Sequence, residues 1–395
     1  MSSILETGFR LRPVSSLTVE LPLSKSIFIR ELVWQFLNRK TLTAPDGQAA
    51  EDIRVTYQAL STVYQHLDNK EDAFVPINVN DCGAAYRFLM AALAITPGHW
   101  LLTGSERLLQ RPILPLVTSL RSIGAQITPA GDGWRIEGKR LQADHIDIDG
   151  SESSQFVSAL LLIATHIGNP AITYLRSTQP SEPYITMTEK VIQQLDCQDN
   201  ITIERDWSAA IFWYAFCAVG RAQQILLKGL SLPSLQGDAI IAQWFTDFGV
   251  STTPTDEGIV IRKINSPLQQ EFQLNLINHP DLAPVLTAMA SILPIKLTLT
   301  ELQNLKHKES ERKANLIKAL SPVASLSAPD EDTLIIKGND NGDSTSLVMD
   351  SHGDHRLVMA YSLLALKHTI AITGADCVRK SYPQFTEELK KIMAN

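Results

Sequence analysis

The chain has 395 residues, of which 44% are hydrophobic and 19% charged, and its formal net charge is −7. This length predicts two domains or three, and the composition predicts packed cores rather than a disordered chain. The negative charge argues against a protein that binds nucleic acid or membranes non-specifically, so any anion site must gather its Lys and Arg residues locally.

Targeting signals and cysteine pairs are not apparent. Residues 1–6 lack a basic start followed by an apolar run, which predicts no secretory signal. The longest apolar runs, residues 156–164 and 211–219, are about 9 residues long and too short to cross a bilayer. No metal-ligand spacing relates the four cysteines, which are Cys82, Cys197, Cys217 and Cys377. We therefore expect a reduced, cytoplasmic protein without a metal.

Six apolar stretches along the chain open in a similar way, with Ser, Gly or Asp at the expected first helical turn. These openings lie at Ser24, Gly83, Ser153, Ser208, Asp281 and Asp354. They recur at intervals of about 55–73 residues, longer than the roughly 20–50 residues of solenoid repeats. The pattern predicts six α/β repeats packed into two globular halves.

A second pattern lies between these openings, in residues 120–136 and 245–261. Each segment indicates a helix that ends at Gly, a strand, a turn containing Thr-Pro at Pro129 or Pro254, and a second strand. A weaker strand pair is expected at residues 325–336. Each repeat should therefore hold two helices and several short strands.

The helix openings have two possible roles. Ser, Gly and Asp are ordinary N-caps, and capping alone suffices to explain any single opening. The first turn of a helix also receives anions well, because its N–H groups are free. Basic or amide side chains stand near several openings, namely Lys25, Arg30, Arg87, Gln155, His355 and Arg356. Several such residues together favour a convergent anion site.

Basic residues also cluster between the repeats. Residues 306–313 could form an exposed, salt-bridged helix start, or could hold the Glu309 carboxylate beside Lys308 and Arg312. Arg111 precedes a proline and so should lie at a helix entrance.

In their order along the chain, these motifs resemble the 5-enolpyruvylshikimate-3-phosphate synthase family. No single motif is specific, but the ordered set covers residues 21–385. The matching segments are LPLSKSIFIR at 21–30, DCGAAYR at 81–87, the stretch 104–112 with GA at 124–125, SSQF at 153–156, SEPY at 181–184, residues 204–210, QGD at 236–238, PD at 280–281, KESER at 308–312, DHR at 354–356 and KSYP at 380–383.

The resemblance implies an α/β fold, α+β in some schemes, of two similar domains that each contain three βαβαββ units. Residues 1–20 and 206–395 would form one domain and residues 21–205 the other, with the active site in the cleft between them. The implied reaction transfers enolpyruvyl from phosphoenolpyruvate to the 5-hydroxyl of shikimate 3-phosphate and releases phosphate, a step of chorismate and aromatic amino acid biosynthesis. We expect no cofactor, no nucleic-acid or membrane partner, and a monomer.

The resemblance also implies the site residues. Shikimate 3-phosphate would contact Lys25, Ser26, Arg30, Ser153, Ser154, Gln155, Ser181, Tyr184, Asp281, Asn304 and Lys308. Phosphoenolpyruvate would contact Lys25, Asp81, Gly83, Arg111, Gln155, Arg312, His355, Arg356 and Lys380. Asp281 and Glu309 would be the catalytic carboxylates, with Lys25 as a further proton donor. Arginine suits these anions because its fork of N–H groups matches carboxylate and phosphate oxygens.

The chain departs from the family pattern in its first two motifs. Leu23 replaces a common Gly, and Phe28 and Ile29 replace a common Ser-Asn pair. Ala84 replaces a Thr and loses a hydroxyl donor. Asp81 stands where Asn is common and brings negative charge toward the expected phosphoenolpyruvate site, so we expect altered affinity for that substrate.

Three alternative functions remain open. The sister enzyme that transfers enolpyruvyl to UDP-N-acetylglucosamine usually carries a Cys before an Arg-Pro motif, and residues 104–112 contain none. An RNA-end-processing relative would predict a basic surface, which the net charge does not suggest. A degenerate paralogue would bind both ligands without turnover.

Overall fold

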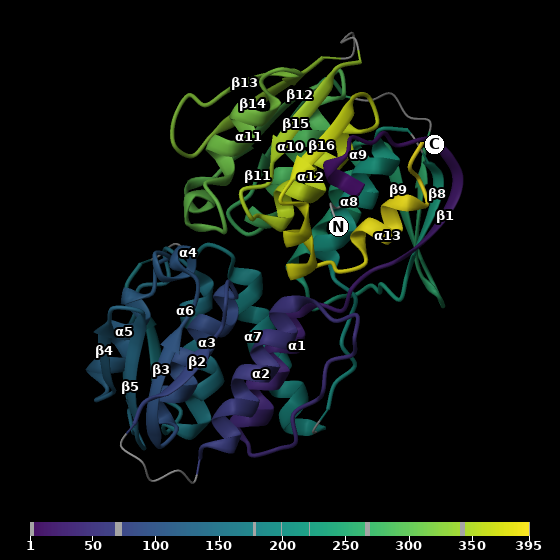
Figure 1. Ribbon diagram of the computed structural model, residues 1–395. Coiled ribbons are helices and arrows are strands. Elements are labelled where there is room, and N and C mark those ends of the chain that lie inside the picture. The colour runs from purple at the N-terminus through teal and green to yellow at the C-terminus, as the bar shows by residue number, and fades with distance from the viewer. Residues whose placement is uncertain are drawn as a thin grey trace. The chain divides into compact units, whose positions relative to one another are not determined.

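The computed structural model describes residues 4–67, 73–176, 179–198, 200–220, 222–264, 269–339 and 344–394. The chain forms two compact units (Figure 1). The first unit combines Met1–Ser24 with Glu204–Asn395, and the second unit is Lys25–Ile203. Each unit contains both helices and sheets, which confirms the predicted mixed class.

The second unit has a four-stranded sheet, a parallel strand pair and a group of packed helices. Its elements are α1 (Lys25–Leu37), α2 (Glu51–Gln65), β2 (Val75–Asn78), α3 (Gly83–Ile95), β3 (Gly98–Thr103), α4 (Glu106–Leu109), α5 (Leu114–Ser122), β4 (Gln126–Ala130), β5 (Gly133–Gly138), β6 (His145–Ile148), α6 (Ser154–Ile163), η2 (Ala164–His166), β7 (Ala171–Tyr174) and α7 (Glu182–Cys197). The sheet order is β2-β3-β5-β4, and β6 pairs with β7. Helix α6 packs against α3 and α7, and α1 packs against α2 and α7.

The first unit has two four-stranded sheets and one parallel strand pair. Its elements are η1 (Ile4–Glu6), β1 (Val14–Glu20), α8 (Trp207–Ala218), β8 (Ala222–Lys228), η3 (Gly237–Ile240), α9 (Ile241–Asp247), β9 (Val250–Thr255), β10 (Gly258–Lys263), β11 (Glu271–Asn275), η4 (Pro280–Leu282), α10 (Ala283–Ser291), β12 (Lys296–Thr300), η5 (Gln303–His307), α11 (Arg312–Leu320), β13 (Ala324–Ser327), β14 (Leu334–Gly338), β15 (Ser346–Asp350), α12 (His355–Leu364), β16 (Thr369–Thr373), η6 (Ala375–Lys380) and α13 (Phe385–Lys390). The sheet orders are β1-β8-β10-β9, β11-β12-β14-β13 and β15-β16.

The expected repeat is visible in the strand order. Three times, two parallel strands are followed by an antiparallel hairpin whose second strand inserts next to the parallel pair. Elsewhere in the described ranges, β6-β7 and β15-β16 keep only the parallel pair, and the α1–α2 repeat has no strand of its own. The segment between α1 and α2 includes Pro45 and Gly47, which disfavour a strand there.

The six predicted helix openings are confirmed, because α1, α3, α6, α8, α10 and α12 begin at or within a few residues of them. Every residue of α8 is buried, as an almost entirely apolar helix requires. Capping is also present, since the Asp206 carboxylate accepts a hydrogen bond of 2.8 Å from the Ala209 N–H. No helix within the described residues is both long and apolar enough to cross a membrane.

The predicted Thr-Pro turns are wrong in detail. Pro129 lies inside β4 and Pro254 inside β9, and the turns follow these strands instead of containing the prolines. Both strands lie at the edge of their sheet. An edge strand tolerates proline because one side of it has no ladder partner that needs the missing N–H.

Candidate active site

A buried ion cluster in the first unit centres on Arg312, the first residue of α11, whose exposure is 1%. Its Nε donates to Asp354 Oδ2 at 2.7 Å, and its Nη1 donates to Asp281 Oδ1 at 2.8 Å. Its Nη2 donates to Glu309 Oε2 at 2.8 Å. One planar guanidinium thus orients three carboxylates from separate segments of the chain.

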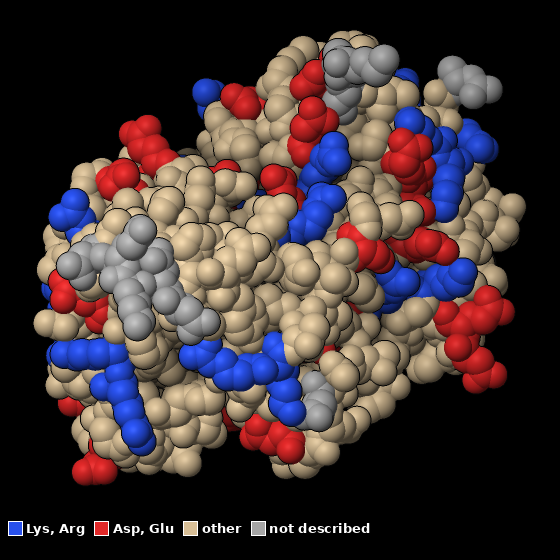
Figure 2. Space-filling model, turned by 60° about the horizontal axis from the view of Figure 1, so that its bottom comes forward, with Lys and Arg blue, Asp and Glu red and all other residues tan. Residues whose placement is uncertain are grey.

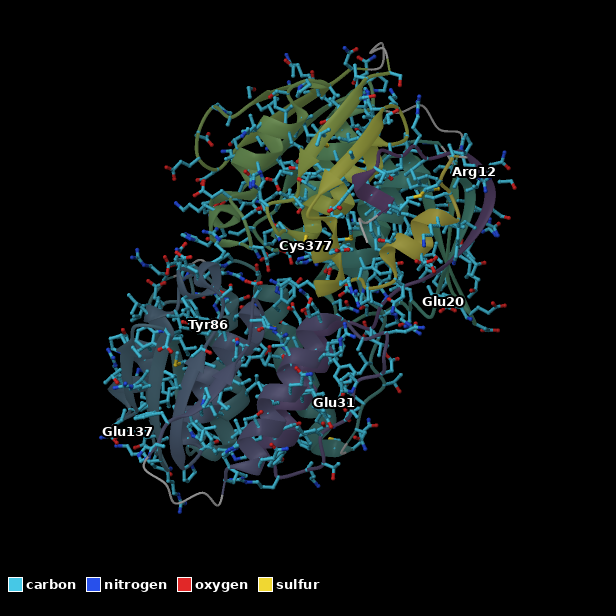
Figure 3. The ribbon with its side chains drawn as sticks, in the orientation of Figure 1. Arg12, Glu20, Glu31, Tyr86, Glu137 and Cys377 are labelled. Atoms are coloured by element: carbon cyan, nitrogen blue, oxygen red, sulfur yellow. The ribbon has the colours of Figure 1, made fainter. Side chains whose placement is uncertain are left out.

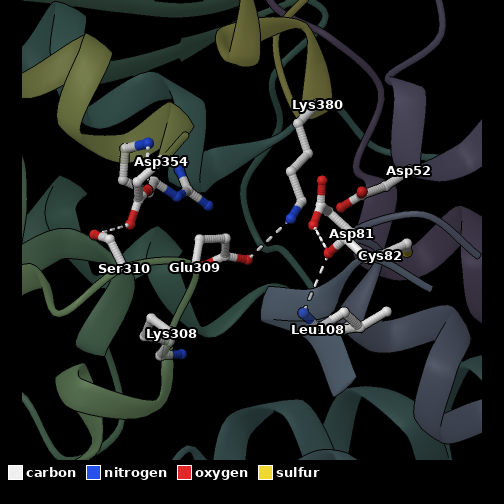
Figure 4. A network of polar contacts seen from close by, with 12 residues as sticks. Asp52, Asp81, Cys82, Leu108, Lys308, Glu309, Ser310, Asp354 and Lys380 are labelled. Atoms are coloured by element: carbon white, nitrogen blue, oxygen red, sulfur yellow. Dashed lines mark hydrogen bonds and ion pairs between the residues drawn. The ribbon is translucent and has the colours of Figure 1, made fainter. Parts of the chain in front are cut away.

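Three further cations surround these carboxylates. Lys308 Nζ lies 3.2 Å from Asp281 Oδ1, and Arg356 Nη2 lies 3.5 Å from Asp281 Oδ2. Lys380 Nζ lies 3.5 Å from Glu309 Oε1 (Figure 4). With Arg312, four cations contact these three carboxylates, and cations gathered in this way can attract an anion.

The charges of the cluster hold Asp281 ionised. Burial raises the pKa of the Asp281 carboxyl, but Lys308, Arg312 and Arg356 outweigh burial and hold that pKa well below its usual range. Burial lowers the pKa of Arg312, but its carboxylate partners raise it above the usual value. Asp281 is therefore a carboxylate that can accept a hydrogen bond from a substrate hydroxyl at neutral pH.

The start of α12 contributes to the same cluster. Asp354 caps this helix by accepting a hydrogen bond of 2.9 Å from the Arg356 N–H, and it accepts another of 3.1 Å from Ser310 Oγ (Figure 4). Arg356 Nη1 donates to the Ser208 carbonyl at 2.8 Å. His355 is buried beside it on α12. Capping and charge organisation thus operate together at this opening.

In the second unit, Lys25 pairs with a residue that the sequence reasoning missed. Lys25 Nζ, at the first residue of α1, lies 2.7 Å from Asp52 Oδ2, and both side chains are largely buried. Asp52 stands in the first turn of α2. The two residues belong to different helices, so no local spacing in the sequence links them.

Arg30 lies in the packing between helices, with an exposure of 2%. Its Nε donates to Thr188 Oγ1 at 2.7 Å, and its Nη2 donates to the Tyr184 carbonyl at 3.2 Å. Its Nη1 donates to the Ser26 carbonyl at 2.8 Å. Burial lowers the pKa of Arg30 to about 10. This arginine therefore holds α1 against the start of α7, next to Ser26 and Tyr184.

A second arginine, Arg87 on α3, connects several predicted phosphoenolpyruvate contacts. Its Nη1 donates to Gln155 Oε1 at 2.9 Å and to the Gly83 carbonyl at 3.1 Å. A Cβ atom added to Gly83 would lie 2.7 Å from Arg111 Nη1. Gly83, Arg111 and Gln155 thus gather around Arg87, which belongs to a recognised motif but was not predicted as a contact.

The other predicted residues lie at helix starts in their own units. Ser153 caps α6 by accepting a hydrogen bond of 3.3 Å from the Gln155 N–H. Ser154 is the first residue of α6, and Ser181 has a left-handed φ of 58° before α7. Asp81 accepts a hydrogen bond from the Ser105 hydroxyl. Asn304 lies in η5, four residues before Lys308.

The departures from the family pattern have a packing role. Phe28 and Ile29 are both buried in α1, where apolar side chains suit the core. Leu23 forms an isolated antiparallel bridge with Arg205.

Charge is mixed on the face of the molecule seen in Figure 2. Lys, Arg, Asp and Glu side chains all occur on the face seen in Figure 2, without one sign covering it. Within the residues that the structure describes, no group of His, Cys, Asp and Glu is arranged to hold a metal ion.

Comparison with known proteins identifies the family. The sequence model of EPSP synthase (3-phosphoshikimate 1-carboxyvinyltransferase) matches residues 14–198 and 196–389. The 3-phosphoshikimate 1-carboxyvinyltransferase of Bacteroides fragilis is 32% identical over 95% of this chain and 94% of its own length. That of Methanospirillum hungatei is 28% identical over 89% of this chain and 91% of its own length.

Solved structures show the same fold. An EPSP synthase from Acinetobacter baumannii has a TM-score of 0.70 at 20% identity, over 98% of this chain and 100% of that one. The enolpyruvyl transferase NikO from Streptomyces tendae has a TM-score of 0.71 at 14% identity, over 98% of this chain and 97% of that one. The fold is therefore that of the enolpyruvyl transferases, and the match of the family model to both halves shows that the chain belongs to the EPSP synthase family.

Proposed function

We propose that this chain transfers the enolpyruvyl group of phosphoenolpyruvate to the 5-hydroxyl of shikimate 3-phosphate and releases phosphate. Family membership supports this reaction. The observation that carries the proposal is the ion cluster around Arg312, in which Asp281 and Glu309 are each held by cations. Such a cluster supplies both the carboxylates that move protons and the cations that bind an anionic substrate.

The reaction has two stages. The 5-hydroxyl oxygen of shikimate 3-phosphate adds to C2 of phosphoenolpyruvate, the hydroxyl proton passes to Asp281, and C3 gains a proton and becomes a methyl group. In the second stage the group that protonated C3 takes a methyl proton back from the resulting tetrahedral adduct, the C2–C3 double bond forms again, and phosphate leaves with the electron pair of the broken C–O bond. Glu309 and Lys25 are the proposed proton donors to C3, and Lys25 and Arg356 would stabilise the charge that develops on the adduct.

Substrate binding is proposed for the residues that match the family motifs. Shikimate 3-phosphate would be held by Lys25, Ser26, Arg30, Ser153, Ser154, Gln155, Ser181, Tyr184, Asp281, Asn304 and Lys308. Phosphoenolpyruvate would be held by Lys25, Asp81, Gly83, Arg111, Gln155, Arg312, His355, Arg356 and Lys380. Because these residues come from both units, the proposal requires that variants in either unit impair turnover.

Phosphate release from phosphoenolpyruvate tests the reaction, measured with and without shikimate 3-phosphate. The proposal predicts release only when both substrates are present. Binding of both ligands without release at any pH would instead indicate a degenerate paralogue. Failure to bind either ligand would contradict the proposed substrates.

A matched pair of variants links the activity to the ion cluster. Glu309→Gln removes a carboxylate held by Arg312 and Lys380, so kcat should fall about 100-fold or more, as loss of a general acid or base does. Glu271→Gln makes the same chemical change at an exposed ion pair with Lys296 in the same unit and should leave kcat unchanged. Equal activity of the two variants would refute the assignment of Glu309.

We also propose that the protein works as a cytoplasmic monomer. The test is light scattering of the purified protein with both substrates present, together with fractionation of the source cells. A mass of two or more chains, or recovery in the membrane fraction, would contradict this proposal.

A further inference from the structure

A ring of polar contacts in the first unit leads from His279 to Asp281. His279 Nδ1 lies 3.3 Å from Asp238 Oδ1, and Asp238 Oδ2 accepts a hydrogen bond from Ser208 Oγ. The Ser208 carbonyl accepts the bond of 2.8 Å from Arg356 Nη1, and Arg356 Nη2 lies 3.5 Å from Asp281. The backbone closes this ring of contacts, because His279 is the N-cap of η4 and Asp281 is the second residue of η4.

Three members of this ring of contacts are buried, whereas His279 and Asp281 are partly exposed. Asp238 is 1% exposed, and Ser208 and Arg356 are buried as well. We infer that the His279 Nδ1 carries the proton of this contact, because an ionised carboxylate oxygen only accepts hydrogen bonds. In a buried network each hydrogen bond restricts the next, so removal of one donor loosens the contacts that follow it.

The His279 side chain also has an apolar contact. The Trp244 ring, on α9, meets the imidazole edge-to-face with the ring centroids 5.3 Å apart. His279 therefore contributes two separable features, which are the N–H donor toward Asp238 and the ring against Trp244.

We propose that His279 is a positioning residue for the enolpyruvyl transfer. His279 fixes the Arg356 guanidinium through Asp238 and Ser208. It also fixes the Asp281 carboxylate, which Arg356 contacts, because His279 and Asp281 belong to the same turn. His279 is not among the residues proposed to bind either reactant. The inference rests on the proposed function, in which Asp281 accepts the hydroxyl proton. A misplacement of about 1 Å at such a group can reduce turnover about 100-fold.

Two substitutions separate the N–H donor of His279 from its aromatic ring. His279→Phe keeps the ring against Trp244 and removes the donor, whereas His279→Asn keeps an N–H donor near the Nδ1 position and removes the ring. We expect His279→Phe to lower kcat about tenfold or more, with the KM of phosphoenolpyruvate changed by less than about threefold. His279→Asn should retain most of the wild-type kcat. Urea unfolding of both variants shows whether they are folded.

Ser208→Ala is a second route to the same result if His279→Phe does not fold. It removes the hydroxyl that donates to Asp238 and leaves the backbone carbonyl in place, so kcat should fall with little change in the KM of phosphoenolpyruvate. Wild-type kcat in His279→Phe, or an equal loss in His279→Asn and His279→Phe, would overturn the inference while the proposed function stands. Absence of phosphate release by the wild-type protein would instead overturn the proposed function, and this inference with it.

Discussion

Glu31 provides a quantitative test of the structure, because it is a carboxyl group buried in α1 (Figure 3). Its exposure is 2%, and it accepts a hydrogen bond of 3.2 Å from Gln35 Nε2 and another from the backbone N–H of Ile201. Burial raises the pKa of Glu31 from 4.5 to about 7, with the Ile201 N–H acting in the opposite direction. The folded protein therefore holds a proton that the unfolded chain releases at lower pH.

The sign of the effect follows from proton linkage. Between pH 4.5 and about 7 the folded state binds more protons at Glu31 than the unfolded state, so this residue lowers stability as the pH rises. A tenfold change in proton affinity is worth about 1.4 kcal/mol, so the full penalty above about pH 7 is on the order of 3 kcal/mol. Glu31→Gln keeps the shape of the protonated side chain and removes the penalty.

The assay is urea unfolding of Glu31→Gln and the wild-type protein at several pH values. We expect the variant to gain stability relative to wild type by about 2 kcal/mol or more between about pH 5 and pH 9. Glu137→Gln, an exposed residue on β5 of the same unit, should show no such trend. A constant difference between Glu31→Gln and wild type over this range would refute the reasoning.

Three further predictions follow from local contacts. Gly83→Ala should fold normally but raise the KM of phosphoenolpyruvate about tenfold or more, because the new Cβ displaces Arg111 and weakens its proposed charge-assisted contact with phosphoenolpyruvate. An unchanged KM in steady-state kinetics would contradict this prediction. Asp206→Ala should lower the free energy of unfolding by about 1–2 kcal/mol through loss of the α8 cap, and an unchanged urea midpoint would exclude that role. Burial raises the pKa of the Cys217 thiol to about 11, so a thiol reagent at neutral pH should label the exposed Cys197 first and Cys217 only after unfolding. Mass spectrometry of the labelled peptides measures this order, and labelling of Cys217 before Cys197 in the folded protein would contradict the prediction.

Local sequence patterns were sufficient to predict the helix starts and the paired strands at residues 120–136, 245–261 and 325–336, whereas the order of the strands in each sheet came from the structure. The opening before α8 combines an Asp cap with a long apolar run, and both signals act within a few residues of each other. The Thr-Pro segments failed as turn signals because proline is favoured both in turns and at sheet edges, and only strand pairing distinguishes the two environments.

The sequence by itself determined the family, the mixed fold class and the set of candidate residues, since each depends on motifs that are local in the chain. Only the tertiary structure decided which partners these residues have. Arg312 is charged and is the first residue of α11, yet it is buried because carboxylates from three segments converge on it. The pairing of Lys25 with Asp52 and the contact of His279 with Asp238 likewise join elements that are separate in the sequence. Such contacts depend on packing in three dimensions, which no spacing along the chain encodes.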